Sequence, residues 1–87
     1  SFRCLAIAYE AARVGGTMPA YMSVANEELV DAYLKDQICF GAIPRFLEDS
    51  LSHHTAVQDY TLDDIHAVDR ESRRVTRAII ARARVQS

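Results

Sequence analysis

Residues 61–85 read TLDDIHAVDRESRRVTRAIIARARV, and this stretch decides the fold of the chain. Apolar or small residues recur in it every three to four positions, the period of an amphipathic α-helix: Leu62, Ile65, Val68, Ser72, Val75, Ile79 and Ala83. Thr61 and Asp64 resemble a capping box in which Asp replaces the preferred Glu. Acidic residues come first and arginines last, which complements the helix dipole. We therefore predict one long helix from Leu62 to about Val85.

The chain begins with a shorter predicted helix, from Ser1 to Val14. Its apolar residues at helical spacing indicate one buried face, formed by Phe2, Leu5, Ala6, Tyr9 and Ala12. Gly15-Gly16 ends this helix, because glycine accepts the left-handed backbone conformation of a helix C-terminus.

Two further helices are expected between these ends. The second begins at one of three rival caps, Thr17, Ser23 or Asn26, and buries Val24, Ala25, Leu29, Ala32 and Tyr33. Lys35 to Gly41 is a connector that turns Ile38 and Phe40 into the core. The third helix opens at Gly41-Ala42-Ile43-Pro44 and has an apolar face of Ile43, Phe46, Leu47 and Leu51. The polar stretch from Ser52 to Tyr60 is predicted as a loop.

Together these segments predict an all-α fold, a single domain (residues 1–87) built as a small antiparallel-type bundle of about four helices. A chain of 87 residues has room for one domain, and 49% hydrophobic residues argue against disorder. No apolar run approaches a membrane span, so no membrane partner is expected. Cys4 and Cys39 are predicted to be free, inert, partly buried thiols in a reducing cytoplasm. Ser at position 1 suggests a piece of a longer protein.

A basic stripe at helical spacing is the first candidate site: Arg70, Arg73, Arg74 and Arg77. Such a stripe can bind the phosphates of nucleic acid. However, residues 1–72 contain all twelve acidic residues and only five of the ten basic ones, and this excess of negative charge would repel a polyanion. A solvated helix face that matches the dipole is the preferred interpretation. A free-standing helical interaction or DNA-binding module that uses Arg70–Arg77, or an adaptor that docks a partner, remains the alternative.

The other candidate sites have equally plain interpretations. The possible metal ligands are His53, His54 and His66 with Asp59 or Asp63, but they lack metal-ligand spacing and are predicted to be polar loop residues. Gly15-Gly16-Thr17 lacks the framework of a phosphate-binding loop and is predicted to be a helix–helix turn. Glu27, Glu28 and Asp31 are expected to be exposed carboxylates and not a cation site. The residues by themselves therefore predict a helical domain with no catalytic, cofactor-binding or metal-binding residue.

Three stretches in order resemble the C-terminal region of the 1-deoxy-D-xylulose 5-phosphate reductoisomerase family: AYEAARVGGTMPA (8–20), MSVANEELVDAYL (22–34) and ICFGAI (38–43). The family pattern reads AYEAGRxGGTxPAVLNAANEVAVxAFL and then IxFxxI. Thr61 to Ile65, Asp69 and Arg73-Arg74 fit its later helix. Ser23 replaces the first Asn of the family pattern, whereas Asn26 and Glu27 are retained, and we expect Asn26 to act in the fold as a helix cap or a backbone ligand.

The resemblance implies a helical C-terminal domain of a three-domain enzyme that converts 1-deoxy-D-xylulose 5-phosphate to 2-C-methyl-D-erythritol 4-phosphate. It implies NADPH and Mg²⁺ or Mn²⁺ as cofactors of the whole enzyme, held by the NADPH-binding and catalytic domains, with none bound to this chain. The partners of this domain are those two domains of the same polypeptide, in a homodimer, without nucleic acid. The expected location is the bacterial cytoplasm, or the plastid in a plant or alga. The 87-residue chain alone is predicted to be inactive.

Overall fold

The computed structural model describes residues 2–86 of the chain. In order they form α1 (Phe2–Val14), α2 (Met18–Leu34), the short 3-10 helix η1 (Phe40–Ala42), α3 (Ile43–Ser52) and α4 (Leu62–Gln86). No strand occurs between residues 2 and 86. The prediction of an all-α bundle of about four helices is confirmed, and Ser1, the predicted start of the first helix, lies outside the described residues.

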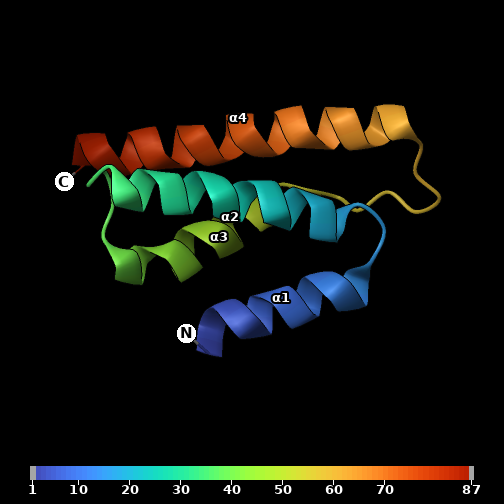
Figure 1. Ribbon diagram of the computed structural model, residues 1–87, viewed down its shortest axis with the longest axis horizontal. Coiled ribbons are helices and arrows are strands. Elements are labelled where there is room, and N and C mark those ends of the chain that lie inside the picture. The colour runs from blue at the N-terminus through green and yellow to red at the C-terminus, as the bar shows by residue number, and fades with distance from the viewer. Residues whose placement is uncertain (1, 87) are drawn as a thin grey trace.

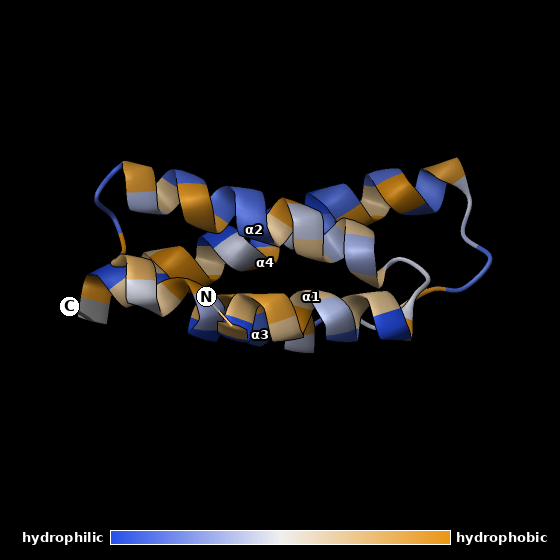
Figure 2. Cartoon of the chain, turned by 60° about the horizontal axis from the view of Figure 1, so that its bottom comes forward, coloured by the Kyte–Doolittle hydropathy of each residue, from blue (hydrophilic) through white to orange (hydrophobic). Residues whose placement is uncertain are grey.

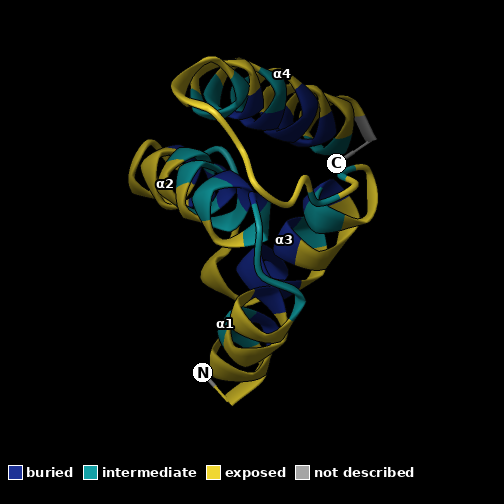
Figure 3. Ribbon diagram, turned by 90° about the vertical axis from the view of Figure 1, so that its right-hand side faces the viewer, coloured by how far each residue is buried: buried dark blue, intermediate teal, exposed yellow. Residues whose placement is uncertain are grey.

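The helices alternate in direction along the chain, and α2 lies at the centre of the bundle. Helices α1 and α3 run one way, whereas α2 and α4 run the other (Figure 1). Helix α2 packs against α4, α3 and α1, and α1 lies on the side of the bundle opposite α4 (Figure 3). Consecutive helices are antiparallel, as predicted. The most extensive interface, between α2 and α4, is nevertheless parallel, because α3 and residues 53–61 together return the chain to the end of the bundle where α2 begins.

The core is built from all four helices around one side of α2. Its buried members are Ile7, Tyr21, Ala25, Leu29, Ala32, Ile43, Leu47, Val68 and Ile80. Leu29 and Leu47 are fully buried at the contact of α2 with α3. Ile38, Phe46 and Leu51 are partly buried against this core, in agreement with the predicted positions of these side chains.

The predicted buried face of the first helix is wrong. All its members are exposed, with Phe2 at 92% and Tyr9 at 71% exposure, whereas the buried residues of α1 are Ile7 and Ala11. Hydrophobic colour recurs along α1 in Figure 2, and apolar residues occupy both exposed and buried positions of this helix. A helix with apolar residues on several faces does not reveal from its own sequence which face meets the neighbouring helices.

Smaller corrections concern residues at the ends of helices. Phe40 was expected in the core but is 61% exposed, with its ring packed edge-on against Tyr33. Leu62 is 71% exposed because it lies in the first turn of α4, before that helix meets α2. Cys39 is exposed, contrary to the prediction of a partly buried thiol, whereas Cys4 is half-buried as expected.

The helix boundaries follow from specific backbone chemistry. Gly15 and Gly16 both have positive φ, at 72° and 54°, and form the predicted turn between α1 and α2. Asp36, with φ 58°, follows α2 in the same left-handed region, and the amide of Gln37 then donates to the carbonyl of Ala32 at 2.9 Å. No glycine marks this helix end, so the sequence pattern does not predict it.

The capping box at the start of α4 is confirmed. The amide of Asp64 donates to Oγ1 of Thr61 at 3.2 Å, and the amide of Thr61 donates to Oδ2 of Asp64 at 2.9 Å. Two backbone donors that have no partner within the helix are satisfied in this reciprocal way. Asp at the third position is therefore a working substitute for Glu here.

Candidate functional site

The basic stripe and the acidic cluster, two separate candidate sites in the sequence, lie against each other in the structure. Oε2 of Glu28 on α2 lies 2.7 Å from Nη1 of Arg73, and its Oε1 lies 2.8 Å from Nε of Arg77. Arg73 also contacts Oε1 of Glu27 at 3.2 Å and Oδ2 of Asp69 at 3.4 Å. The parallel packing of α2 on α4 brings these charges together, so each cluster neutralises the other.

Glu28 is the centre of this ion-pair network. Its side chain is only 11% exposed, which corrects the prediction that these carboxylates are simply solvated. The hydrogen bond from Arg77, reinforced by Arg73, holds the pKa of Glu28 below its usual range, against the opposing effect of partial burial. The same contacts raise the pKa of Arg73, first through Glu28 and then through Asp69 and Glu27. The network joins α4 to α2, and both carboxylate oxygens of Glu28 are paired with arginine.

The remaining members of the basic stripe do not complete a nucleic-acid interface. Arg74 forms an ion pair with Glu71 on its own helix at 2.6 Å, and Arg70 is exposed. Three of the four arginines are thus paired with carboxylates that a phosphate would have to displace. The arrangement does not support the alternative of a DNA-binding module.

A buried polar chain crosses the centre of the bundle, and the sequence analysis missed it. Oγ of Ser50 on α3 lies 3.2 Å from the Tyr21 hydroxyl on α2 and 2.7 Å from Oγ1 of Thr76 on α4. Oγ of Ser72 donates to the carbonyl of Tyr21 at 2.7 Å. All four residues are fully buried, and no buried side-chain polar atom among the described residues lacks a partner. Satisfied buried hydroxyls fix the register of three helices, because any shift would leave one without a partner.

Thr17 holds the loop between α3 and α4 against the start of α2. It was a predicted helix cap, but its side chain makes no capping hydrogen bond. Its Oγ1 instead accepts a hydrogen bond from the amide of Val57 at 2.9 Å and lies 2.8 Å from Nε2 of His54. The amide of Thr17 donates to the carbonyl of Val57 at 3.1 Å. Of the three rival caps, Thr17 is the one that lies at the cap position of α2, but its completely buried hydroxyl binds the distant loop and not the first turn of the helix.

The predicted histidine candidates do not converge on a metal site. The His54 ring stacks on Tyr21 with 4.5 Å between ring centroids, and burial lowers the pKa of His54. His53 lies 3.4 Å from Asp49 one turn earlier, and His66 is exposed on α4. Within residues 2–86, no group of three histidine, cysteine or acidic residues is arranged to hold a metal ion. His54 is a half-buried packing residue rather than a solvated loop residue.

Two other sequence candidates also have structural places. The amides of Gly15 and Thr17 donate to the carbonyls of Ala11 and Val57, so they are not available to cradle a phosphate. Asn26 lies in the middle of α2 and does not cap a helix, which corrects that expectation. It lines a mainly apolar hollow of about 420 Å³ together with Val30 and Phe40.

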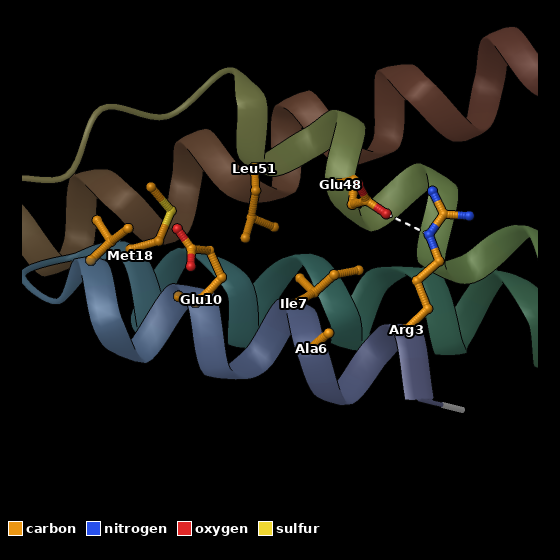
Figure 4. A pocket seen from close by; sticks show the side chains of 9 residues that line it. Arg3, Ala6, Ile7, Glu10, Met18, Glu48 and Leu51 are labelled. Atoms are coloured by element: carbon orange, nitrogen blue, oxygen red, sulfur yellow. Dashed lines mark hydrogen bonds and ion pairs between the residues drawn. The ribbon is translucent and has the colours of Figure 1, made fainter.

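An apolar groove lies between α1 and α3. Figure 4 shows Ile7 and Leu51 facing one another across it, with Met18 at one end and the ion pair of Arg3 with Glu48 at the other. Its volume is about 400 Å³. The groove contains no pair of groups suited to proton transfer or nucleophilic attack, since its charged residues Arg3 and Glu48 form an ion pair with each other. No helix of the described residues is long and apolar enough to cross a membrane.

The comparisons with known proteins agree with this geometry. The family model described as the DXP reductoisomerase C-terminal domain matches residues 1–75. A 1-deoxy-D-xylulose 5-phosphate reductoisomerase of Bacillus pumilus is 43% identical over 79 residues, covering 91% of this chain and 21% of that protein. The corresponding enzyme of Desulfosudis oleivorans is 44% identical over 79 residues, with the same coverage of 91% and 21%.

A solved structure gives the same result in three dimensions. The reductoisomerase of Zymomonas mobilis in complex with NADPH superposes with a TM-score of 0.81 at 37% sequence identity, covering 87% of this chain and 20% of that one. The chain thus spans only about a fifth of the length of these relatives. Because the family model covers most of the chain, this helical bundle belongs to the family of DXP reductoisomerase C-terminal domains.

Proposed function

We propose that this chain is the helical C-terminal part of a longer NADPH-dependent enzyme that converts 1-deoxy-D-xylulose 5-phosphate to 2-C-methyl-D-erythritol 4-phosphate. The observation that carries the proposal is the family match over residues 1–75, together with relatives that carry this activity in their names. The chain corresponds to 21% of the length of such a relative, which supports a role as one part of the enzyme.

NADPH and a divalent metal ion, Mg²⁺ or Mn²⁺, are the cofactors expected for the whole enzyme, and the residues of this chain do not fit either group. No metal-binding group of three ligands occurs among residues 2–86, and the Glu28 carboxylate is held by two arginines. The amides of Gly15 and Thr17 already have backbone partners. We therefore assign no catalytic, cofactor-binding or metal-binding residue to this chain and derive no chemical step on it.

The role we propose for the domain is mechanical. Satisfied hydroxyls join α2, α3 and α4, and the Glu28 ion pairs join α2 to α4, so these three helices form one rigid block. A rigid block can hold adjoining catalytic segments in a fixed conformation, because reacting groups are placed precisely only when the surrounding structure is rigid. The partners in this role are the NADPH-binding and catalytic domains of the same polypeptide, and we expect the whole enzyme to be a homodimer. The named relatives are bacterial, which favours the bacterial cytoplasm over a plastid.

The test compares the 87-residue chain with the longer protein encoded by its complete reading frame. Both are assayed for oxidation of NADPH that depends on 1-deoxy-D-xylulose 5-phosphate and Mg²⁺. We expect turnover by the longer protein and none by the 87-residue chain. Turnover by the short chain would contradict the assignment of a purely structural role, and an inactive but folded longer protein would contradict the proposed reaction. Light scattering of the longer protein tests the dimer.

A further inference from the structure

One face of α1 is apolar, exposed and covered by no other helix of the bundle. We name it the outer face; its members are Phe2, Leu5, Tyr9 and Ala12. Exposure is 92% for Phe2, 53% for Leu5 and 71% for Tyr9. A shallow hollow lies among Leu5, Ala8, Tyr9 and Ala12, so the face is shaped and not smooth. In Figure 3, α1 forms the edge of the molecule farthest from α4 and is largely exposed.

The charged side chains of α1 are engaged in ion pairs and are not members of the outer face. Arg3 forms an ion pair with Glu48 on α3, and Arg13 forms one with Glu10 one turn earlier. Two of the most exposed side chains on the outer face are aromatic, and a fully exposed aromatic side chain presents about 200 Å². With the exposures above, Phe2, Leu5 and Tyr9 together present roughly 400 Å² of mostly apolar surface. Patches of this size on a single folded unit typically mark an interaction site.

A second, separate apolar surface lies where α1 meets α2 and η1. The hollow beside Asn26 is lined by Cys4 of α1, Val30 of α2 and Phe40 of η1. Phe40 in turn packs edge-on against Tyr33, and both rings are partly exposed. This second apolar surface shares no residue with the outer face, so the outer face is a surface by itself.

Two occupants can cover the outer face, a second copy of this chain or the polypeptide that precedes it in a longer protein. A stable interface between separate molecules buries about 800 Å² on each partner, roughly twice what the three large side chains of the outer face supply. A covalently attached partner needs less area, because the connection raises its effective concentration. Since α1 begins at Phe2, any preceding polypeptide arrives at the end of the outer face itself.

We infer that the outer face of α1 is the surface on which the preceding part of the same polypeptide docks. The inference rests on the proposed function, because it requires the longer chain. The match to a family described as a C-terminal domain, over only 21% of a relative's length, supports an occupant that lies earlier in the chain. The same docking explains why a helix with two buried residues carries large apolar side chains on the side facing away from the bundle.

The experiment measures the reactivity of a thiol placed on the outer face. Tyr9→Cys is made in the 87-residue chain and in the longer protein, both with Cys4→Ala and Cys39→Ser so that the native thiols do not react, and any further cysteine of the longer protein is likewise replaced. Leu62→Cys is the matched control, since Leu62 on α4 is also 71% exposed in the bundle. Leu5→Cys is a second probe in case the first variant fails to fold. The rate of alkylation is followed by mass spectrometry.

We expect the Tyr9→Cys thiol to react at least about tenfold more slowly in the longer protein than in the short chain, and the Leu62→Cys thiol to react at similar rates in both. Equal rates at Tyr9→Cys and Leu5→Cys in a folded, active longer protein overturn the docking inference and leave the proposed reaction intact. Protection in a folded longer protein that lacks turnover supports the docking and contradicts the proposed reaction. Protection that appears in the short chain at high concentration, without more in the longer protein, assigns the face to a second copy and overturns the inference. Equal protection of the control site also overturns it.

Discussion

Replacing Gly16 by alanine tests the close approach of the loop between α3 and α4 to the turn between α1 and α2. Gly16 has φ 54°, and a Cβ atom built on it lies 2.5 Å from the carbonyl oxygen of Val57. That oxygen accepts the amide hydrogen of Thr17 at 3.1 Å, and the amide of Val57 donates to Oγ1 of Thr17 at 2.9 Å. The backbone of Val57 cannot move away without straining or breaking these two hydrogen bonds.

The cost can be worked out in two steps. A left-handed conformation costs a residue with a side chain about 1–2 kcal/mol, of which the reduced freedom of the unfolded chain offsets about 0.4–1 kcal/mol. Losing one or both hydrogen bonds adds about 0.5–1.5 kcal/mol each. The sum for Gly16→Ala is about 1–4 kcal/mol, which in a domain of this size lowers the melting temperature by roughly 5–30 °C.

The other two glycines of the chain are matched controls. Gly15 has φ 72°, but the nearest atoms to its Cβ position are 4.0 Å away, so Gly15→Ala carries only the conformational cost of about 1 kcal/mol. Gly41 has no positive φ and no atom within 4 Å, so Gly41→Ala should be neutral or stabilise by up to about 1 kcal/mol. Urea unfolding followed by circular dichroism gives all three values. If Gly16→Ala destabilises no more than Gly15→Ala, the argument from the Val57 contact is refuted.

Three further predictions concern polar contacts. Thr76→Val removes one of the two hydrogen-bond partners of the buried Ser50 hydroxyl, which keeps Tyr21, and should cost about 0.5–1.5 kcal/mol in urea unfolding. Thr76→Ser keeps a hydroxyl and should cost less; equal costs would contradict a hydrogen-bond origin. Glu28→Gln should destabilise the fold by only about 1 kcal/mol, since its partner Arg77 is 65% exposed. The folded pKa of Glu28 is lowered, so the contribution of its carboxylate to stability is full above pH 4.5 and is lost on acidification below that value. An equal loss of stability below pH 4.5 in the variant and the parent chain would refute this. Burial lowers the pKa of His54 below its ordinary value of 6.5. The neutral ring therefore stabilises the fold fully above pH 6.5, and this contribution is lost as the pH falls from 6.5 through the folded pKa. His54→Asn should flatten the decline in the urea midpoint between pH 7 and 5, and an equal slope in the two proteins would count against this role.

Sequence patterns predicted the elements of this fold better than its contacts. The capping box of Thr61 and Asp64 and the glycine turn were predictable because they depend on residues adjacent in the chain. The buried face of α1 was not, since choosing between Ile7 and Tyr9 requires knowing where α2 and α3 lie. Large apolar residues are usually buried, and this tendency led to the prediction that the outer face is the buried one, although no helix of this bundle covers it.

The contacts made by the candidate-site residues could not be predicted for a related reason. The arginine stripe and the acidic cluster were each judged alone, although a separation of 45 residues between Glu28 and Arg73 concealed that they bind one another. Thr17 was predicted as a cap from its place after two glycines, but the distant Val57 and His54 occupy its hydroxyl. One contact could have been predicted from the sequence. Ser72 is a polar residue within the otherwise apolar stripe of α4, and such a residue indicates a buried hydrogen bond, which the structure shows to the carbonyl of Tyr21.

The parallel pairing of α2 with α4 also has a consequence for the order in which the domain folds. The hydrogen bonds that join these helices link residues 45 to 51 positions apart, whereas α1, α2 and α3 meet through short connections. Local contacts form before distant ones, because the chain between distant partners must first be ordered. During synthesis α1, α2 and α3 can therefore associate first, while the side of α2 that packs against α4 remains exposed. The bundle closes only after α4 has left the ribosome, so its completion follows the synthesis of every segment that precedes it.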